Sequence, residues 1–128
     1  MKTVKRYASG GPFEQAYGYS RVVQAGPWLF TAGCTAIVNG VVQHVDDAGA
    51  QARTAFWIAL AALEKAGATV DDVVRTRMYV SPEADIDAVG RAHGELFGTV
   101  KPTSGLYIVE GFVLPEILVE VEVEAYLT

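Results

Sequence analysis

The chain has 128 residues, the length of one domain, and 51% hydrophobic against 20% charged residues, a globular composition. Its formal charge of −5 disfavours nucleic acid as a partner, because the summed field repels polyanions. The longest apolar run, residues 56–63, is too short to span a bilayer, and the N-terminus lacks the apolar core of a signal peptide. We therefore expect one cytoplasmic domain over residues 1–128, with no membrane partner.

The first third of the chain predicts a β-meander. Strand-like segments cover residues 3–8, 16–26 and 27–33, and Gly26-Pro27 separates the last two as a hairpin connection would. Asn39-Gly40 is a turn signal that predicts a smaller hairpin.

Two helices follow. Apolar residues recur at helical spacing from Ala48 to Ala66, and Gly67 ends that segment. A second helix is predicted to start at Ser81-Pro82 and to end before Lys101-Pro102. Its apolar stripe consists of Ile86, Val89, His93, Leu96 and Phe97.

Further strands are predicted at residues 72–80, 103–111 and 117–127, which gives the order β-β-β-α-β-α-β-β. This order indicates an α+β fold, one sheet with both helices packed on one face. In the strand at 72–80 we expect two faces, one with Val74, Thr76, Met78 and Val80 and the other with Arg75, Arg77 and Tyr79.

The last strand alternates valine with glutamate in the sequence LVEVEVEAYL, residues 118–127, so one of its faces is apolar and the other acidic. Two helices cannot cover both faces of such a sheet, so the acidic face is expected to share the uncovered side with Arg75 and Arg77. For Glu122 and Glu124 the simplest interpretation is exposed ion pairs, each contributing about 0.2–1 kcal/mol. Because aromatic residues are expected on the same face, we also predict a subunit interface there.

Several segments together resemble the Rid (YjgF) family: GYSRVVQAGPWLFTAG, LEKAGATVDDVVRTRMYV, AHGELFG before KPTSG, and LPEILVEVEVEA. The resemblance runs from about Tyr17 to Tyr126. It implies a chorismate-mutase-like α+β fold and a homotrimer whose sheets line a central barrel, with clefts between neighbouring subunits. It also implies hydrolysis of reactive enamines and imines to a keto acid and ammonia, without a cofactor.

The resemblance also places the family's site residues. The glutamate thought to activate water falls on Glu120, the tyrosine of an early strand on Tyr19, and the glycine whose backbone N–H holds the substrate on Gly33. Cys34 follows that glycine, and Ala32 stands where serine is usual.

The main departure is Ser104, which stands where the family has a carboxylate-binding arginine. Losing hydrogen bonds to a charged group costs roughly 1.5–3 kcal/mol each. An imine derived from an ordinary amino acid is therefore expected to be a poor substrate, unless Arg77, Arg91 or Lys101 supplies the missing cation.

The second helix departs as well, with Gly90 in place of an asparagine and His93 three residues further on. A histidine beside Glu120 would place an acid and a base in one cleft, although a buried, hydrogen-bonded role for His93 is the simpler interpretation. For Cys34, a small apolar side chain that fills the core is preferred over a nucleophile. Tyr19 either packs in the core or an interface, or contacts a ligand. Glu120 is either a base that activates water or a member of a structural ion pair.

No metal is expected, since one cysteine and two distant histidines are too few ligands for zinc. The preferred function is a Rid-like enzyme acting on an imine, enamine or enol-type metabolite by hydrolysis, deamination or tautomerisation. The alternative is a ligand-binding or regulatory trimer without catalysis. RNA cleavage is disfavoured by the net charge.

Overall fold

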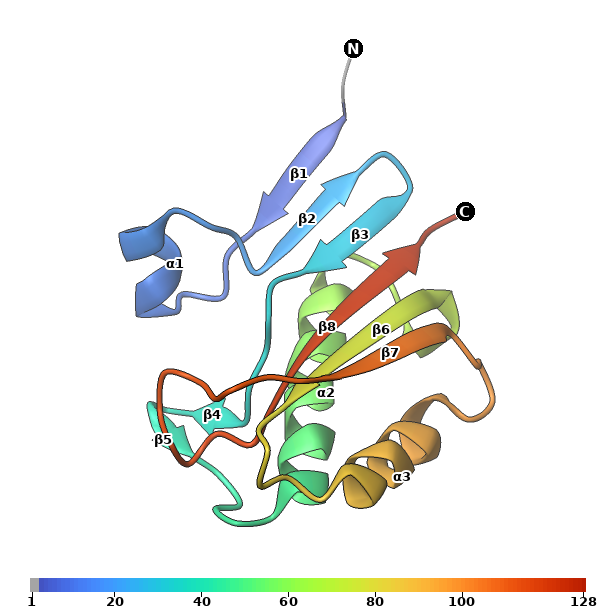
Figure 1. Ribbon diagram of the computed structural model, residues 1–128. Helices are drawn as coiled ribbons and strands as arrows, with labels where there is room; N and C mark the ends of the chain where they lie inside the picture. The colour runs from blue at the N-terminus through green and yellow to red at the C-terminus, as the bar shows by residue number, and fades with distance from the viewer. Residues whose placement is uncertain (1–2) are drawn as a thin grey trace.

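The computed structural model describes residues 3–128, and its largest element is a twisted six-stranded sheet (Figure 1). The strands lie in the order β1-β2-β3-β8-β6-β7, and β6–β7 is the only parallel pair described. Their bounds are β1 Val4–Tyr7, β2 Val22–Ala25, β3 Trp28–Thr31, β6 Val73–Val80, β7 Thr103–Ile108 and β8 Val119–Tyr126.

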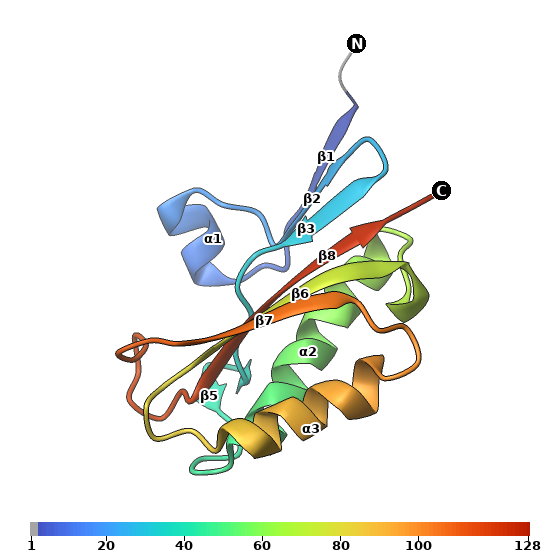
Figure 2. The same ribbon diagram turned by 45° about the vertical axis from the view of Figure 1, so that its right-hand side comes forward.

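The helices α2 (Ala48–Lys65) and α3 (Ile86–Phe97) lie against one face of this sheet, as the two views show (Figures 1 and 2). The predicted α+β fold is therefore confirmed. Small residues on the inner side of α2 let it pack closely on the buried valines of β8. The core formed in this way includes Ala52, Ala55, Phe56, Ala59, Leu63, Val119, Val121 and Val123.

The prediction of a strand over residues 16–26 is wrong for the first half of that segment. Residues Pro12–Tyr17 form a short helix, α1, which has proline in its first turn and ends at Gly18 in the left-handed conformation, with φ 78°. The strand β2 starts only at Val22. Tyr17 and Tyr19 consequently do not share a strand face.

Two other differences from the sequence prediction have local causes, one at the start of a helix and one in the register of a strand. The second long helix starts at Ile86 and not at Ser81, because the Asp85 side chain accepts the backbone N–H of Ala88 at 3.0 Å and caps the helix there. In β6 the register shifts between Val73 and Arg75, so Val73 is buried and Val74 is exposed, contrary to expectation.

Both predicted hairpins are present. β2 and β3 pair around Gly26, whose φ is 60°. The strands β4 (Ile37–Val38) and β5 (Val41–Val42) form a separate two-stranded sheet. Their turn residues Asn39 and Gly40 both have positive φ, 52° and 78°, as a tight hairpin of this kind requires.

The entry to β8 is held by a buried polar side chain of α2. The Gln51 amide donates to the Glu116 carbonyl at 2.9 Å and accepts the Leu118 backbone N–H at 2.8 Å. Gln51 is fully buried, so these bonds are shielded from water. They fix where β8 starts and therefore where its acidic side chains lie.

Within residues 3–128, no helix has both the length and the apolar character needed to cross a membrane.

We predict that Gln51→Leu lowers the free energy of unfolding by about 2–4 kcal/mol, because it leaves buried backbone groups of Glu116 and Leu118 without partners. Chemical denaturation measures the loss. The control is Gln15→Leu, a change at an exposed position of α1, which should cost far less. Equal losses in the two variants would mean that the Gln51 tether is not needed.

Candidate functional site

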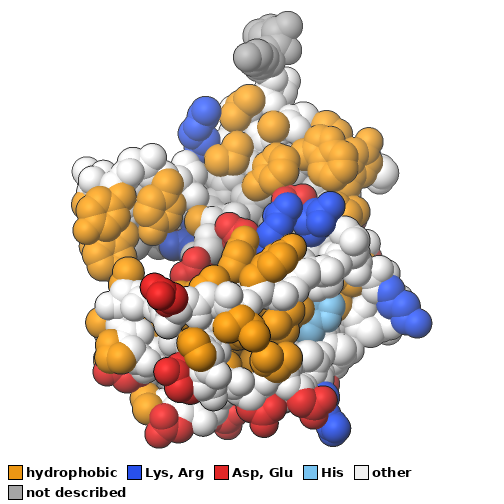
Figure 3. Space-filling model, in the orientation of Figure 1, with side chains coloured by type: hydrophobic (Ala, Val, Ile, Leu, Met, Phe, Trp, Pro, Cys, Tyr) orange, Lys and Arg blue, Asp and Glu red, His pale blue; other side chains and the backbone are white. Residues whose placement is uncertain are grey.

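The face of the sheet opposite α2 and α3, here called the open face, carries the charged side chains of β6 and β8. Glu124 forms ion pairs with Arg77 at 2.6 Å and with Arg75 at 3.6 Å, as expected for an exposed charged face. Glu122 instead accepts the Tyr79 hydroxyl at 2.7 Å, and this hydrogen bond, with burial, raises the pKa of Tyr79 to about 12. Figure 3 shows basic and acidic side chains between patches of hydrophobic ones on this side.

Glu120 differs from the other two glutamates of β8. Its carboxylate lies against the backbone of Gly33, so closely that a Cβ added to that glycine would be 2.3 Å from the Glu120 Oε2. Among residues 3–128 it forms no ion pair. A residue with any side chain at position 33 would displace it, which explains why glycine fits here.

Burial raises the pKa of Glu120, and the neighbouring Glu122 carboxylate raises it further, while Arg21 opposes both. A raised pKa makes a carboxylate a better proton acceptor, as a general base requires. Glu120 therefore has the electrostatic setting of a general base.

Cys34 joins this site through the backbone. It bridges Val121 of β8, with the Cys34 N–H donating to the Val121 carbonyl at 2.8 Å and the reverse bond at 2.9 Å. The Cys34 side chain is only 2% exposed. Burial raises the pKa of its thiol, against the opposing effect of Arg21, so the neutral thiol dominates at neutral pH. These properties agree with the small-filler interpretation.

Arg21 lies at the centre of the cluster and was not among the residues singled out from the sequence. Its Nη1 donates to the Gly33 carbonyl at 2.7 Å and contacts the Cys34 sulfur at 3.5 Å. Its guanidinium carbon lies 5.9 Å from the centre of the Tyr19 ring. Arg21 is therefore the cation that contacts the predicted site residues Tyr19, Gly33 and Cys34.

Glu14 of α1 holds Arg21 from the other side. Its Oε2 accepts Arg21 Nη2 at 3.4 Å and the Ser9 hydroxyl, and its Oε1 accepts the Ser9 backbone N–H at 2.9 Å. The Glu14 side chain is 5% exposed and that of Arg21 is 16% exposed. Burial opposes ionisation of Glu14, yet the bonds from Ser9 and the charge of Arg21 outweigh it and lower its pKa. The pair is ionised on both sides.

Ser104 and His93 lie on the other side of the sheet. Thr76 of β6, fully buried under the helices, donates its hydroxyl to the Ser104 Oγ at 2.8 Å, and its oxygen lies 2.7 Å from the His93 Nε2. The His93 ring packs against Phe56 and Phe97, and burial lowers its pKa, so it is neutral at neutral pH.

Within one chain, therefore, His93 and Glu120 do not form the acid and base of one cleft, because the sheet separates them. The hydrogen-bonded role expected for His93 is the one observed. Ser104, which was expected from the resemblance to the family to stand at the arginine position, likewise points away from Glu120, since it shares the face of Thr76.

The three cations considered as replacements are also placed elsewhere. Arg77 is held by Glu124, Arg91 pairs with Asp87 at 2.7 Å on the exposed side of α3, and Lys101 lies at an exposed turn with φ 54°. Arg21 alone among the cations discussed influences the pKa of Glu120.

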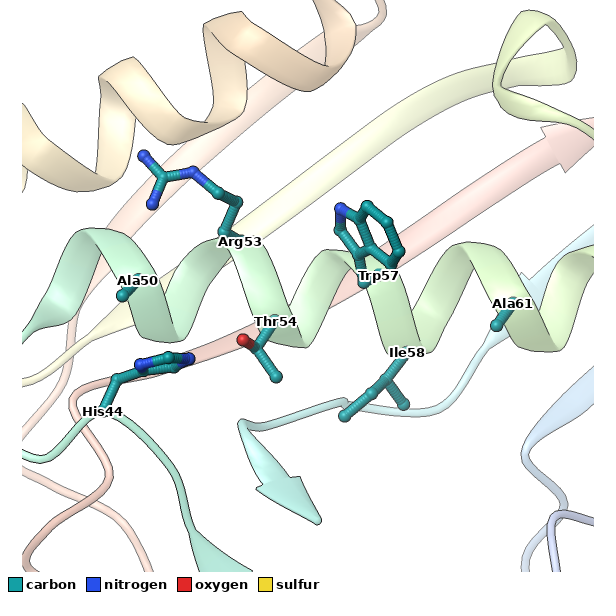
Figure 4. Close-up of a pocket in the computed structure, with 7 residues that line it drawn as sticks. All are labelled: His44, Ala50, Arg53, Thr54, Trp57, Ile58 and Ala61. Carbon is teal, nitrogen blue, oxygen red and sulfur yellow. The ribbon is translucent and has the colours of Figure 1, made fainter.

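A separate hollow of about 510 Å³ lies on the outer side of α2, remote from Glu120 (Figure 4). It is open and mostly apolar, and its one guanidinium, Arg53, is held by Glu95 at 2.8 Å. Its lining residues are His44, Ala50, Arg53, Thr54, Trp57, Ile58 and Ala61. No cluster of three potential metal ligands occurs in residues 3–128.

Comparison with known proteins agrees with this architecture. Residues 12–127 match the family described as endoribonuclease L-PSP. An uncharacterised protein of Streptomyces coelicolor is 41% identical over 125 residues, which is 98% of this chain and 93% of that protein. A RutC family protein of Pyrococcus horikoshii is 33% identical over 110 residues, 84% of this chain and 86% of that protein.

Among solved structures, a Mycobacterium tuberculosis member of the YjgF/YER057c/UK114 family superposes with a TM-score of 0.87 at 39% identity, covering 98% of this chain and 100% of that one. A Pseudomonas aeruginosa protein of unknown function gives 0.84 at 34% identity, covering 99% and 94%. The fold, the family match and these relatives agree, and the chain belongs to the YjgF (endoribonuclease L-PSP) family.

Proposed function

We propose that this protein is a small-molecule enzyme in which Glu120 activates water against an imine, enamine or enol-type metabolite. The observation that carries the proposal is the setting of the Glu120 carboxylate: partly buried, not ion-paired among residues 3–128, seated on Gly33, and with a raised pKa. Membership of the family supports a small-molecule role.

In imine hydrolysis, the oxygen of water bonds to the imine carbon, the π electrons of the C=N bond move to nitrogen, and Glu120 takes a proton from the water. Glu120 passes that proton to the nitrogen, which gives a neutral carbinolamine. It then takes the proton of the new hydroxyl group and delivers it to the nitrogen as the C–N bond breaks and the C=O bond forms. One imine and one water give one carbonyl compound and one ammonia, with no change of oxidation state. The same proton transfer by Glu120 would serve the tautomerisation of an enol.

A homotrimer with clefts between subunits is part of the proposal. Large aromatic side chains remain 38–48% exposed on and around the open face, an unusual surface for a free monomer. They are Trp28, Phe30, Tyr107 and Tyr126. Packing these faces against one another would bury them and enclose the Glu120 site from its uncovered side.

A binding or regulatory role without catalysis is the second candidate. It is favoured by the placement of Ser104 behind the sheet, which leaves the Glu120 site without the family's usual carboxylate anchor. RNA cleavage is a weaker candidate, because the chain is acidic and both Arg75 and Arg77 are already paired with Glu124 on the open face.

Glu120→Gln provides the central test. We predict that it abolishes turnover of the imine that the wild type hydrolyses fastest, because glutamine cannot take the proton from water. It should also raise the melting temperature at pH 7. A carboxyl group whose pKa is raised by folding stabilises the protein fully below about pH 4.5 and loses that contribution as the pH rises through its folded pKa, so a neutral side chain is preferred at pH 7.

The two readouts are the rate of carbonyl release and the melting temperature between pH 4 and pH 8. The thermal gain should shrink toward pH 4. Unchanged turnover would rule out the base role. A lower melting temperature at pH 7 would instead identify Glu120 as a structural ion-pair member.

Gly33→Ala should show whether activity depends on the position of the Glu120 carboxylate, because it should move that carboxylate without disturbing the fold. The new Cβ would lie 2.3 Å from the Glu120 Oε2, so the carboxylate must move, and we expect at least a tenfold loss of kcat with little loss of stability. The matched control is Gly94→Ala on α3, where an added Cβ meets nothing within 4 Å. Full activity in Gly33→Ala would show that the close approach has no functional role.

For the assembly we predict a particle of three times the chain mass of 13.7 kDa by light scattering. Trp28→Glu should dissociate it, because a carboxylate would be buried in the interface. Trp57→Glu, at an exposed tryptophan of α2 on the opposite side, should not. A monomeric wild type would contradict the proposed clefts.

A further inference from the structure

Arg21 is the cation that reaches the Glu120 site, but its guanidinium is already engaged. Nη1 donates to the Gly33 carbonyl at 2.7 Å, and Nη2 faces the Glu14 carboxylate at 3.4 Å. A carboxylate ligand is normally gripped by two parallel N–H groups of one guanidinium. Here each Nη atom already donates to a group of the protein itself, and the Glu14 carboxylate balances the charge of the guanidinium.

Glu14 is held firmly in this position. It is 5% exposed, and the Ser9 hydroxyl and backbone N–H both donate to it, so it cannot turn away from Arg21 without losing several hydrogen bonds at once. Its helix α1 is closed by Gly18 in the left-handed conformation, and the Gly18 N–H donates to the Glu14 carbonyl at 2.9 Å. These bonds, here called the Glu14 latch, therefore hold both the backbone and the side chain of Glu14 in place.

The charge around the site is negative once this pairing is counted. Glu14 cancels Arg21, and Glu120 and Glu122 remain, each of which opposes further negative charge nearby. A ligand carboxylate placed beside Glu120 would meet two carboxylates and no free cation among those discussed above. A neutral or protonated imine would meet no such penalty.

We infer that the substrate of the Glu120 site carries no carboxylate, being a neutral or cationic imine, and that Glu14 sets this specificity by occupying Arg21. The inference rests on the proposed function in that it concerns the same site. It assigns to Arg21 and Glu14 the role of specificity-determining residues. It also predicts that removing one negative charge, that of Glu14, removes the preference for a ligand without a carboxylate.

The experiment measures binding and not turnover, so its failure is distinct from a failure of the proposed catalysis. The probes are 2-oxobutanoate and its neutral isostere 2-oxobutanamide, which differ only in the carboxylate. Their dissociation constants are measured at pH 7.5 by titration of the isotope-labelled full chain, followed by NMR. The wild type should bind the amide at least tenfold more tightly than the acid.

Glu14→Gln keeps the shape of the side chain and frees the charge of Arg21. We expect it to tighten binding of the acid at least tenfold, since a charge-assisted pair then becomes available, and to change binding of the amide less than twofold. Adding Arg21→Gln to this variant should remove the gain. Glu64→Gln, which makes the same change of net charge at an exposed position of α2, should leave both constants unchanged.

If Glu14→Gln does not fold, Ser9→Ala loosens the same latch and should show a smaller gain for the acid in the same direction. Preference of the wild type for the acid would overturn the inference. So would a Glu14→Gln or Ser9→Ala variant whose affinity for the acid is unchanged, and so would failure of both probes to bind any of these proteins.

Discussion

The alternation of side chains along β8 is the constraint on which the rest of the structure depends. This strand lies between β3 and β6, so its backbone is paired on both sides and cannot slide by one residue without exchanging its two faces. Its valines are buried beneath α2, and burying each contributes on the order of 1.5–3 kcal/mol. That burial fixes the three glutamates on the open face.

The three glutamates share one face but have different surroundings, and this difference distinguishes the two that stabilise the fold from the one proposed to act on a ligand. Glu124 is neutralised by two arginines and Glu122 accepts a tyrosine hydroxyl, so both are satisfied within the chain. Glu120 instead meets the bare backbone of Gly33 and a guanidinium that belongs to another carboxylate. A partly buried carboxylate that forms no ion pair among residues 3–128 is better suited to a ligand than to stabilising the fold.

Much of the fold could be predicted from the sequence because periodicity is local. The period of two in β8 and the helical spacing in α2 identified both elements, and the Asn39-Gly40 turn identified its hairpin. The start of β2 could not be found in the same way, since α1 has only 6 residues and its helical character depends on the proline in its first turn and on the bonds that Ser9 donates to Glu14. The bulge at Val74 is likewise a feature of strand pairing.

The site was predictable where it lies on β8 and at Gly33, but not where charges meet across the chain. Arg21 and Glu14 are 7 positions apart in the sequence, and their spacing alone does not indicate an ion pair. The one available signal was an arginine inside GYSR, next to the residues of the resemblance. Similarly, the separation of Ser104 from Glu120 follows from the register of β6 with β7, which the sequence alone does not specify.

The central position of β8 has a consequence for biosynthesis. The strand that joins the β1–β2–β3 half of the sheet to the β6–β7 half follows all the other strands along the chain, so it leaves the ribosome after them. Until its final residues emerge, two partly formed sheets with unpaired edges and an uncovered apolar helix face must coexist in the nascent chain. The sheet can therefore be completed only after β8 has been made, and the same strand carries the glutamate on which the chemistry is proposed to depend.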